Sequence, residues 1–279
     1  MGTPGSPATL VMGVLNVTPD SFSDGGRFEA TDAAISHAHR LVSRGADIVD
    51  IGGESTRPGA ERVDPAEEME RVLPVIRALA QEGVVVSIDT MRAATAEASV
   101  AAGASIVNDV SGGLADPRMA AVVAAADVDF VVMHWRAHSA TMDAHDQYVD
   151  VVREVRDELA ARVDALTAAG VRDERIILDP GLGFAKVADT NWPLLATMAE
   201  WSGGRRVLIG ASRKRFLGTV IARPGVDAGD PARRDHATTA VTALAAQAGA
   251  WAVRVHDARA SSDAVRVVSA WQNALDTTR

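Results

Sequence analysis

The feature that most constrains the fold is a regular alternation of short apolar runs with longer segments of helical character. Eight such runs occur, and they stop at polar residues or glycines. Runs of this length indicate buried strands of a parallel sheet, and the segments between them indicate helices. The runs cover residues 10–15, 47–51, 84–88, 106–107, 130–133, 176–178, 207–209 and 251–255.

Eight alternating strand–helix units predict an α/β fold, a single (β/α)8 TIM barrel with its active site at the C-terminal ends of the strands. Long loops follow the first and second strands, at residues 18–28 and 54–63. An open doubly wound sheet is the alternative, but no G-x-G-x-x-G turn follows the first strand. Residues 1–8 are rich in glycine, proline and serine, so we expect a disordered N-terminus. No linker interrupts residues 9–279, so we expect them to form one barrel domain.

Local signals predict several helix positions. Asp64 is followed by a proline and then by Glu67, a pattern that predicts an N-cap, a first helical position and a capping-box acid. We expect further helix starts at Thr31 and Ser261, and one helix over residues 192–201.

Composition excludes several classes of protein. The net charge of −9 and the lack of a long basic stretch argue against a nucleic-acid partner. The chain has no cysteine, which excludes disulfides, thiolate metal sites and a cysteine nucleophile. It has neither an apolar stretch of membrane-spanning length nor a secretory signal pattern. We therefore expect a cytoplasmic protein without a membrane partner.

Polar side chains follow the predicted strands at all eight strand ends. A few buried polar groups can serve as structural hydrogen-bond anchors, but a set this large is more than the fold requires. In a barrel these side chains converge at one mouth, so we infer a binding site there. The set contains Asn16, Asp50, Asp89, Asn108, His134, Asp179, Lys214, Arg254 and His256.

The types of these side chains narrow the ligand. Asp89, Asn108 and Asp179 offer acceptors and an amide, which suit a flat heterocycle with N–H and amino donors beside a carbonyl. Lys214 can donate to a carbonyl or a ring nitrogen. Hydrolytic triads and nucleotide triphosphatases have no support, because no nucleophile elbow, P-loop or H-E-x-x-H motif is present.

A second group of residues suits an anion and a metal ion. Arg57, Arg254 and His256 could gather an oxyanion, with arginine making bidentate contacts to phosphate. Asn16 and Asp24 offer hard oxygen ligands for Mg²⁺, which commonly shares its coordination shell with phosphate and water.

A cluster of three cations follows the seventh strand, in residues 207–216. Lys214 lies within this cluster, and only one other lysine, Lys186, occurs among the 28 basic residues. A retained lysine suggests that a compact ammonium is needed where a planar guanidinium would not serve. A solvated basic turn at a helix start is the simpler interpretation of such a cluster. Lys186 could merely pack beside the site or cap a helix.

With these residues assembled, the sequence resembles dihydropteroate synthase, a pterin-binding TIM-barrel family, in a high-GC actinobacterial version. The resemblance extends over almost the whole chain, and its motifs are jointly specific. They are M-G-V-L-N-V-T-P-D-S-F-S-D-G-G (12–26), G-G-E-S-T-R-P-G-A (52–60), S-I-D-T (87–90), N-D-V-S-G-G (108–113), D-P-G-L-G-F-A-K (179–186), G-A-S-R-K-R-F-L-G (210–218) and V-R-V-H-D (253–257).

The resemblance implies a transferase of folate biosynthesis that condenses para-aminobenzoate with hydroxymethyl-dihydropterin pyrophosphate. It also implies Mg²⁺, a homodimer and the status of a sulfonamide target. The catalytic residues would be Lys214, Asp89, Asp179 and Arg254. The pterin would be bound by Asp89, Asn108, Met133, Asp179, Gly210 and Lys214.

The resemblance also implies which residues bind para-aminobenzoate, the pyrophosphate and the metal ion. The para-aminobenzoate pocket would be formed by Thr56, Pro58, Phe184, Ser212 and Lys214. The pyrophosphate would be held by Asn16, Arg57, Arg254 and His256. The metal ligands would be Asn16 and Asp24.

Two alternatives remain at this point. A corrinoid-linked methyltetrahydrofolate methyltransferase would share the pterin-binding residues, but it would have no need for the S-R-K-R and R-V-H segments. A non-catalytic pterin-binding paralogue would not need an intact set of Asn16, Arg57, Lys214 and His256.

Overall fold

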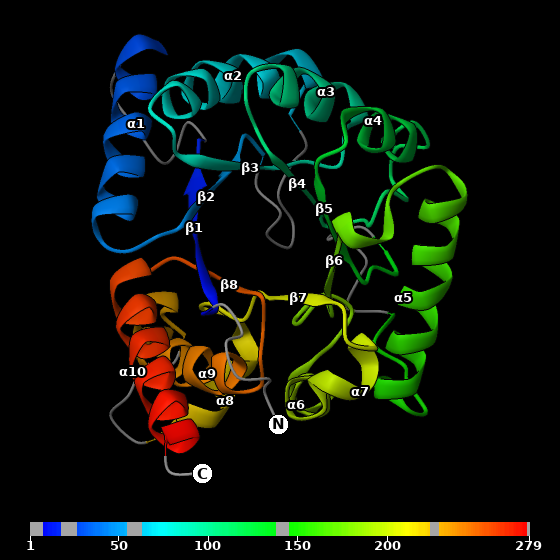
Figure 1. The fold of residues 1–279 in the computed structure, drawn as a ribbon, viewed down its shortest axis with the longest axis vertical. Helices are drawn as coiled ribbons and strands as arrows, with labels where there is room; N and C mark the ends of the chain where they lie inside the picture. The colour runs from blue at the N-terminus through cyan, green and yellow to red at the C-terminus, as the bar shows by residue number, and fades with distance from the viewer. Residues whose placement is uncertain (1–7, 18–26, 55–62, 138–144, 224–228, 278–279) are drawn as a thin grey trace.

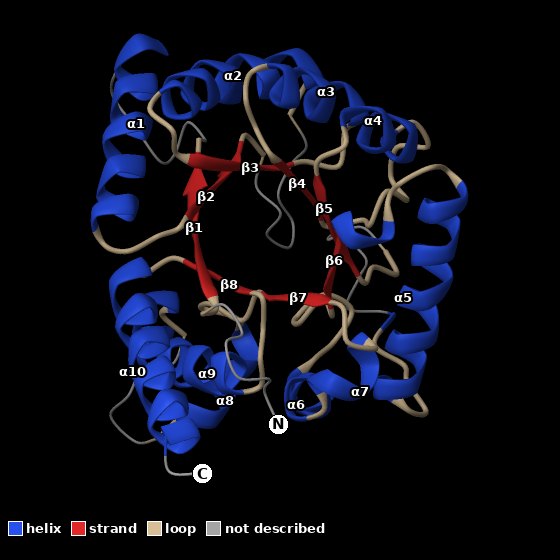
Figure 2. Cartoon of the chain, viewed as in Figure 1, coloured by secondary structure: helices blue, strands red, loops and turns tan. Residues whose placement is uncertain are grey.

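The chain forms a closed barrel of eight parallel strands that follow one another in sequence order, as predicted (Figures 1 and 2). The structure is a computed structural model, and it describes residues 8–17, 27–54, 63–137, 145–223 and 229–277. The strands are β1 Leu10–Asn16, β2 Ile48–Gly52, β3 Val85–Asp89, β4 Ile106–Asp109, β5 Asp129–Met133, β6 Ile176–Asp179, β7 Arg206–Ile209 and β8 Ala252–Val255.

Helices form a layer around the outside of the barrel (Figure 2). They are α1 Arg27–Ser43, α2 Pro65–Gln81, α3 Ala93–Ala101, α4 Met119–Ala126, α5 Val151–Ala168, α6 Asn191–Ala196, α7 Met198–Ser202, α8 Arg215–Ile221, α9 Asp235–Gln247 and α10 Ala258–Thr277. Among the described residues, none of these helices has the length and apolar character needed to cross a membrane.

Two apolar clusters stabilise this arrangement. The larger one fills the space between the outer faces of the strands and the helices, and it includes Trp201 and Phe130. The smaller one fills the inside of the barrel below the site, and its buried members are Met12, Ile48, Ile106, Val131, Ile177, Leu208 and Ala252. Aliphatic side chains dominate this interior layer, as expected for a chain with only 4% aromatic residues.

The register of the strands brings the predicted site residues to one end. Asn16 lies beside Gly52, Gly52 beside Asp89, and Asp89 beside Asn108. Across β5 and β6, Met133 lies beside Asp179. The C-terminal ends of the strands therefore form one continuous rim.

Helix boundaries differ from the predictions at three places. Asp64 caps α2 as predicted, with its carboxylate accepting from the Ala66 N–H at 2.8 Å, but Glu67 pairs with Arg71 and does not complete a capping box. α1 begins at Arg27, four residues before Thr31, since no helix breaker separates the two positions.

The last helix begins at Ala258, so Ser261 is buried within it and the carboxylate of Asp257 accepts from the Arg259 N–H. The helix expected over residues 192–201 is divided at Thr197, and the Trp201 indole N–H donates to the Leu194 carbonyl at 2.8 Å. That carbonyl lies in the last turn of α6, where no later helical N–H can reach it.

Candidate active site

The floor of the barrel mouth is a charged cluster built around Arg254. Its Nε donates to Asp50 Oδ2 at 2.6 Å, and its Nη2 donates to Asp89 Oδ2 at 2.7 Å. Asn108 donates from Nδ2 to the same Asp50 oxygen at 3.2 Å. Asp50 is completely buried, and its Oδ1 has no hydrogen-bond partner within the described part of the chain. The floor therefore contains one buried acceptor without a partner, on Asp50, and one carboxylate that keeps 6% exposure, on Asp89.

Burial and charge shift the protonation of this cluster. Burial raises the pKa of Asp89 to about 7; Arg254 opposes the rise, whereas Asp50, Glu68 and Asp109 add to it. Burial alone would lower the pKa of Arg254, but the carboxylates of Asp50 and Asp89 outweigh it and raise this pKa. Two carboxylates thus share one guanidinium, and one of them exchanges its proton near neutral pH.

The opposite wall is formed by Asp179, at the end of β6, and Lys214, which precedes α8. A methyl group added at Gly210 would lie 3.5 Å from Asp179 Oδ2 and 3.9 Å from Lys214 Nζ, so Gly210 leaves the space between the two side chains open. Burial raises the pKa of Asp179, and Lys214 opposes this shift. Burial lowers the pKa of Lys214 to about 8, against the opposing charge of Asp179.

Lys214 does not form a solvated basic turn. Its ammonium donates to the Leu182 carbonyl in the loop after β6, and its Nζ lies 4.6 Å from the centroid of the Phe184 ring. The simpler interpretation of the basic cluster is therefore wrong for this residue. Arg213, its neighbour, is fixed by a pair of hydrogen bonds to Asp235 at 2.7 and 2.8 Å.

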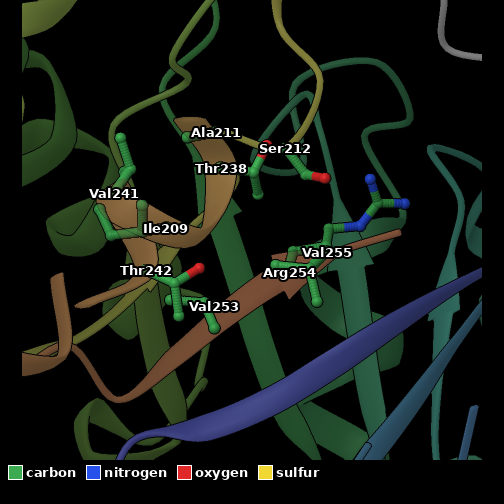
Figure 3. A pocket seen from close by; sticks show the side chains of 9 residues that line it. All are labelled: Ile209, Ala211, Ser212, Thr238, Val241, Thr242, Val253, Arg254 and Val255. Atoms are coloured by element: carbon green, nitrogen blue, oxygen red, sulfur yellow. The ribbon is translucent and has the colours of Figure 1, made fainter. Parts of the chain in front are cut away.

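The rim on the side of β7 and β8 contains Ser212 and His256. The Ser212 hydroxyl oxygen lies 3.0 Å from His256 Nδ1, and it accepts from the His256 backbone N–H at 3.2 Å. A crevice between these strands and α9 reaches Ser212 (Figure 3). Its lining side chains, including Val241 and Val253, turn toward one another, whereas the side chain of Arg254 extends away from them. The crevice belongs to the packing between sheet and helix, and the site lies on the inner side of the barrel.

The other predicted residues fall into two groups. Asn16 ends β1 and is partly buried, and Met133 ends β5 with 4% of its surface exposed. Four predicted residues, Asp24, Thr56, Arg57 and Pro58, lie outside the described residues.

Of the two predicted magnesium ligands, Asn16 lies within the described residues. Its amide oxygen is a suitable hard ligand at the end of β1, but the described residues contain no group of three or more acidic, histidine or cysteine side chains arranged to hold a metal ion. One amide fits a Mg²⁺ ion that takes most of its ligands from phosphate and water.

A polar network that sequence reasoning missed lies beside Asp89, around Arg92. Arg92 pairs with Glu68 and Glu54 at 2.7 Å each, and it donates to the Val63 carbonyl at 2.7 Å. Glu68, with 1% of its side chain exposed, also accepts from Thr90 at 2.8 Å. Arg92 thus ties together the two residues that flank segment 55–62. The signal for it was its place two residues after Thr90 in the strand-end segment.

The sequence assigns no role to two further residues of the site. Asp50 and His134 appear among the strand-end polar side chains, but a strand-end position alone does not identify their partners. The structure shows that Asp50 completes the floor and that His134 contacts Lys186 at 2.9 Å.

This geometry defines a barrel enzyme with a polar, charged mouth, and comparison with known proteins identifies its family. Residues 12–256 match the family described as pterin binding enzyme, and the chain belongs to that family. It is 54% identical over 266 residues to the dihydropteroate synthase of Mycobacterium leprae, an alignment covering 95% of this chain and 94% of that protein.

Two solved structures extend the likeness. A Xanthomonas albilineans dihydropteroate synthase with 4-aminobenzoic acid is 42% identical, with a TM-score of 0.86 over 95% of this chain and 93% of that one. A Yersinia pestis dihydropteroate synthase with a sulfonamide drug is 36% identical, with a TM-score of 0.87 over 98% and 99%. The predicted resemblance is confirmed, and with it the function of a dihydropteroate synthase and the class of transferase.

Proposed function

We propose that the enzyme joins 4-aminobenzoate to hydroxymethyl-dihydropterin pyrophosphate and releases pyrophosphate. The observation that carries this proposal is the combination of buried acceptors with one ammonium at the barrel mouth. The floor contains the carboxylates of Asp50 and Asp89, and the wall contains Asp179 beside the ammonium of Lys214. A pterin has N–H and amino donors on one edge and a carbonyl beside them, which matches these acceptors and this donor.

The pterin position is supported by burial. Asp89, Asn108 and Asp179 are 3–6% exposed, so their hydrogen bonds to a ligand would be shielded from water. Met133, at the end of β5, lies between Asn108 and Asp179 in the strand order, and Gly210 follows β7 on the other side of Asp179; both would border the faces of the ring. Charge-assisted bonds of this kind contribute about 1.5–3 kcal/mol each.

The 4-aminobenzoate would lie next to the loop after β6. The Phe184 ring and Lys214 Nζ are in contact, and Ser212 lies two residues before Lys214. Thr56 and Pro58 are proposed to complete this pocket from the segment after β2.

The pyrophosphate would be held by cations on the rim. Arg254 lies on β8 and His256 directly follows that strand, and Arg57 is proposed to join them. Asn16, together with Asp24, would hold Mg²⁺, which when bound supplies positive charge to the pyrophosphate oxygens. The bonds to Asp50 and Asp89 use only Nε and Nη2 of Arg254, so its guanidinium keeps further N–H donors for the leaving group.

The chemistry follows from these placements. The C–O bond to pyrophosphate breaks with its electron pair on the leaving oxygen, and the aniline nitrogen then bonds to the methylene carbon and releases a proton. Asp89 and Asp179 stabilise positive charge on the pterin, Arg254 stabilises the leaving group, and Lys214 orients the two substrates. We propose an S_N1-like path, because the described carboxylates and cations of the mouth suit the separated charges of such a path.

Two measurements test this function. Release of pyrophosphate should require both 4-aminobenzoate and the pterin pyrophosphate. Folded protein that releases none in the presence of Mg²⁺ would instead support a non-catalytic pterin-binding paralogue. Secondary kinetic isotope effects at the methylene should report a loose transition state, and a tight associative displacement would rule out the S_N1-like path.

The proposal extends to a cytoplasmic homodimer. Apolar side chains remain exposed on the outer helices α9 and α10, namely Leu244 at 65%, Val267 at 67%, Trp271 at 65% and Leu275 at 51%. Together with α9, α10 forms one side of the molecule (Figure 1). The Val267→Asp substitution should shift the mass measured by light scattering toward that of a monomer. An unchanged mass for this variant would place the dimer interface elsewhere.

A further inference from the structure

Both lysines of the chain donate to a single loop, the 181–186 loop that follows β6. Lys214 donates to the Leu182 carbonyl from the side of the site. Lys186 donates to the Gly181 carbonyl at 3.3 Å and to the Phe184 carbonyl at 3.2 Å. The two ammonium groups therefore take different carbonyls of the same loop. The role of Lys186 is not explained by the reaction itself, since no substrate group is expected to reach it.

The third partner of Lys186 is His134. Lys186 Nζ lies 2.9 Å from His134 Nδ1, and His134 Nε2 lies 2.9 Å from Glu158 Oε2. A carboxylate only accepts, so we assign the hydrogen of the imidazole to Nε2, which leaves Nδ1 as an acceptor. Burial and the charge of Lys186 lower the pKa of His134 to about 4, which keeps the ring neutral. Lys186 thus faces three acceptors, which match the three N–H donors of its ammonium.

The backbone of the 181–186 loop is wound tightly around this ammonium. Gly181, Gly183 and Ala185 have φ values of 67°, 70° and 47°, all in the left-handed region. A Cβ at Gly181 would lie 2.4 Å from the His134 carbonyl oxygen, so the loop approaches the end of β5 closely. The left-handed form costs about 1–2 kcal/mol for a residue such as Ala185 and requires contacts that hold it.

We propose that Lys186 is a positioning residue for 4-aminobenzoate. Its ammonium fixes the carbonyls of Gly181 and Phe184, and through them the Phe184 ring and the Leu182 carbonyl that orients Lys214. A guanidinium cannot take this place, because it is larger and its five donors lie in one plane. This inference rests on the proposed function, in which 4-aminobenzoate lies beside Phe184 and Lys214.

The first test is the Lys186→Met substitution in the full chain, assayed with each substrate varied in turn. We expect the KM for 4-aminobenzoate to rise about tenfold or more, while the KM for the pterin pyrophosphate stays within about twofold. A purely structural lysine would lower Tm and leave both KM values of the folded fraction unchanged, which would overturn the proposal. If the wild type itself released no pyrophosphate, the proposed function would fail first.

The second test uses pH and does not require a buried substitution. Burial lowers the pKa of Lys186 to about 7, and the charges of Asp179 and, more weakly, Glu158 oppose this shift. When Lys186 loses its proton, the KM for 4-aminobenzoate should rise. The Glu158→Gln change lowers the pKa of Lys186 further, so it should move this rise in KM to lower pH. An unmoved profile would overturn the proposal even if Lys186→Met failed to fold. The charged or titratable groups facing Lys186 are Asp179, Lys214, Arg136, Glu158, His134 and Tyr148.

A matched control is available in the same cluster. The Tyr148 ring centroid lies 5.8 Å from Lys186 Nζ, and within the described residues its hydroxyl has no hydrogen-bond partner. The Tyr148→Phe substitution should change neither the KM for 4-aminobenzoate nor its pH profile. An effect as large as that of Lys186→Met would show that the region responds to any change, and would count against a specific role for the ammonium.

Discussion

Asp89→Asn should make the ligand-free enzyme more stable and much less active. The side chain is 6% exposed and lies near the carboxylates of Asp50, Glu68 and Asp109. An asparagine at this position can still accept from Arg254 through Oδ1, and Arg254 keeps Asp50 as its counterion. The substitution therefore removes the repulsion within the cluster and retains most of its hydrogen bonds.

The magnitude follows from the pKa of Asp89, which rises from 3.8 in the unfolded chain to about 7 in the folded protein. The folded state binds the proton more tightly, so this group lowers stability as pH rises from 3.8 to 7, and the effect is constant above 7. At 1.36 kcal/mol per pKa unit, the full effect is on the order of 4 kcal/mol. Between about pH 5 and about pH 8.5 the stability of Asp89→Asn relative to wild type should increase by about 3 kcal/mol.

Urea denaturation of both proteins at the two pH values measures this difference. The control is Asp109→Asn. Asp109 accepts from the backbone N–H groups of Ser111 and Gly113, so the side-chain NH2 group of an asparagine would face one of these N–H donors. Because burial also raises the pKa of Asp109, to about 6, this variant should gain about 1 kcal/mol relative to wild type between the two pH values, but it should remain less stable than wild type at both. A loss of stability for Asp89→Asn at about pH 8.5 would refute the reasoning, since it would mean that the Arg254 ion pair outweighs the cost of burial. Activity should fall about 10- to 100-fold or more, with the loss of a charge-assisted bond to the pterin.

Three further changes test other parts of the site. Lys214→Arg should reduce turnover about 100-fold, because a planar guanidinium cannot make the contacts of a compact ammonium between two substrates. Near-normal turnover would contradict this. Ser212→Ala should lower kcat/KM about tenfold, because His256 loses the hydroxyl that holds its ring; steady-state kinetics with the pterin pyrophosphate varied would measure it. Arg92→Gln should lower the free energy of unfolding by about 3–5 kcal/mol in urea, because it leaves the buried Glu68 without its counterion; a loss below about 1 kcal/mol would show that the pair contributes little.

The fold could be predicted from the sequence because each strand is buried on both faces. Such strands appear as uninterrupted apolar runs, and all eight predicted runs coincide with strands to within two residues. Helix ends were less predictable, since they depend on short signals that compete. Ser261 is of a residue type that favours the N-cap position, but Asp257, four residues earlier, is the N-cap of this helix.

The members of the site could be predicted, but several of their contacts could not. A strand-end position places Asp89 and Arg254 at the barrel mouth, yet their ion pair joins residues 165 positions apart in the chain. The pairing of Lys186 with His134 similarly depends on how the loops after β5 and β6 meet. Contacts of this kind are set by side-chain directions in the closed barrel, and the local sequence carries no information about them.

The use of only two lysines has a practical consequence for chemical labelling. The basic residues are otherwise arginines, so amine-reactive reagents find no lysine other than Lys186 and Lys214. Lys186 is 3% exposed. Lys214 is partly exposed, and burial lowers its pKa to about 8, so a fraction of its amine is neutral and nucleophilic under mild conditions. Beyond the N-terminal amine, acylation of the folded protein should therefore concentrate on Lys214. Its protection by a bound ligand would report occupancy of the site directly, without an activity assay.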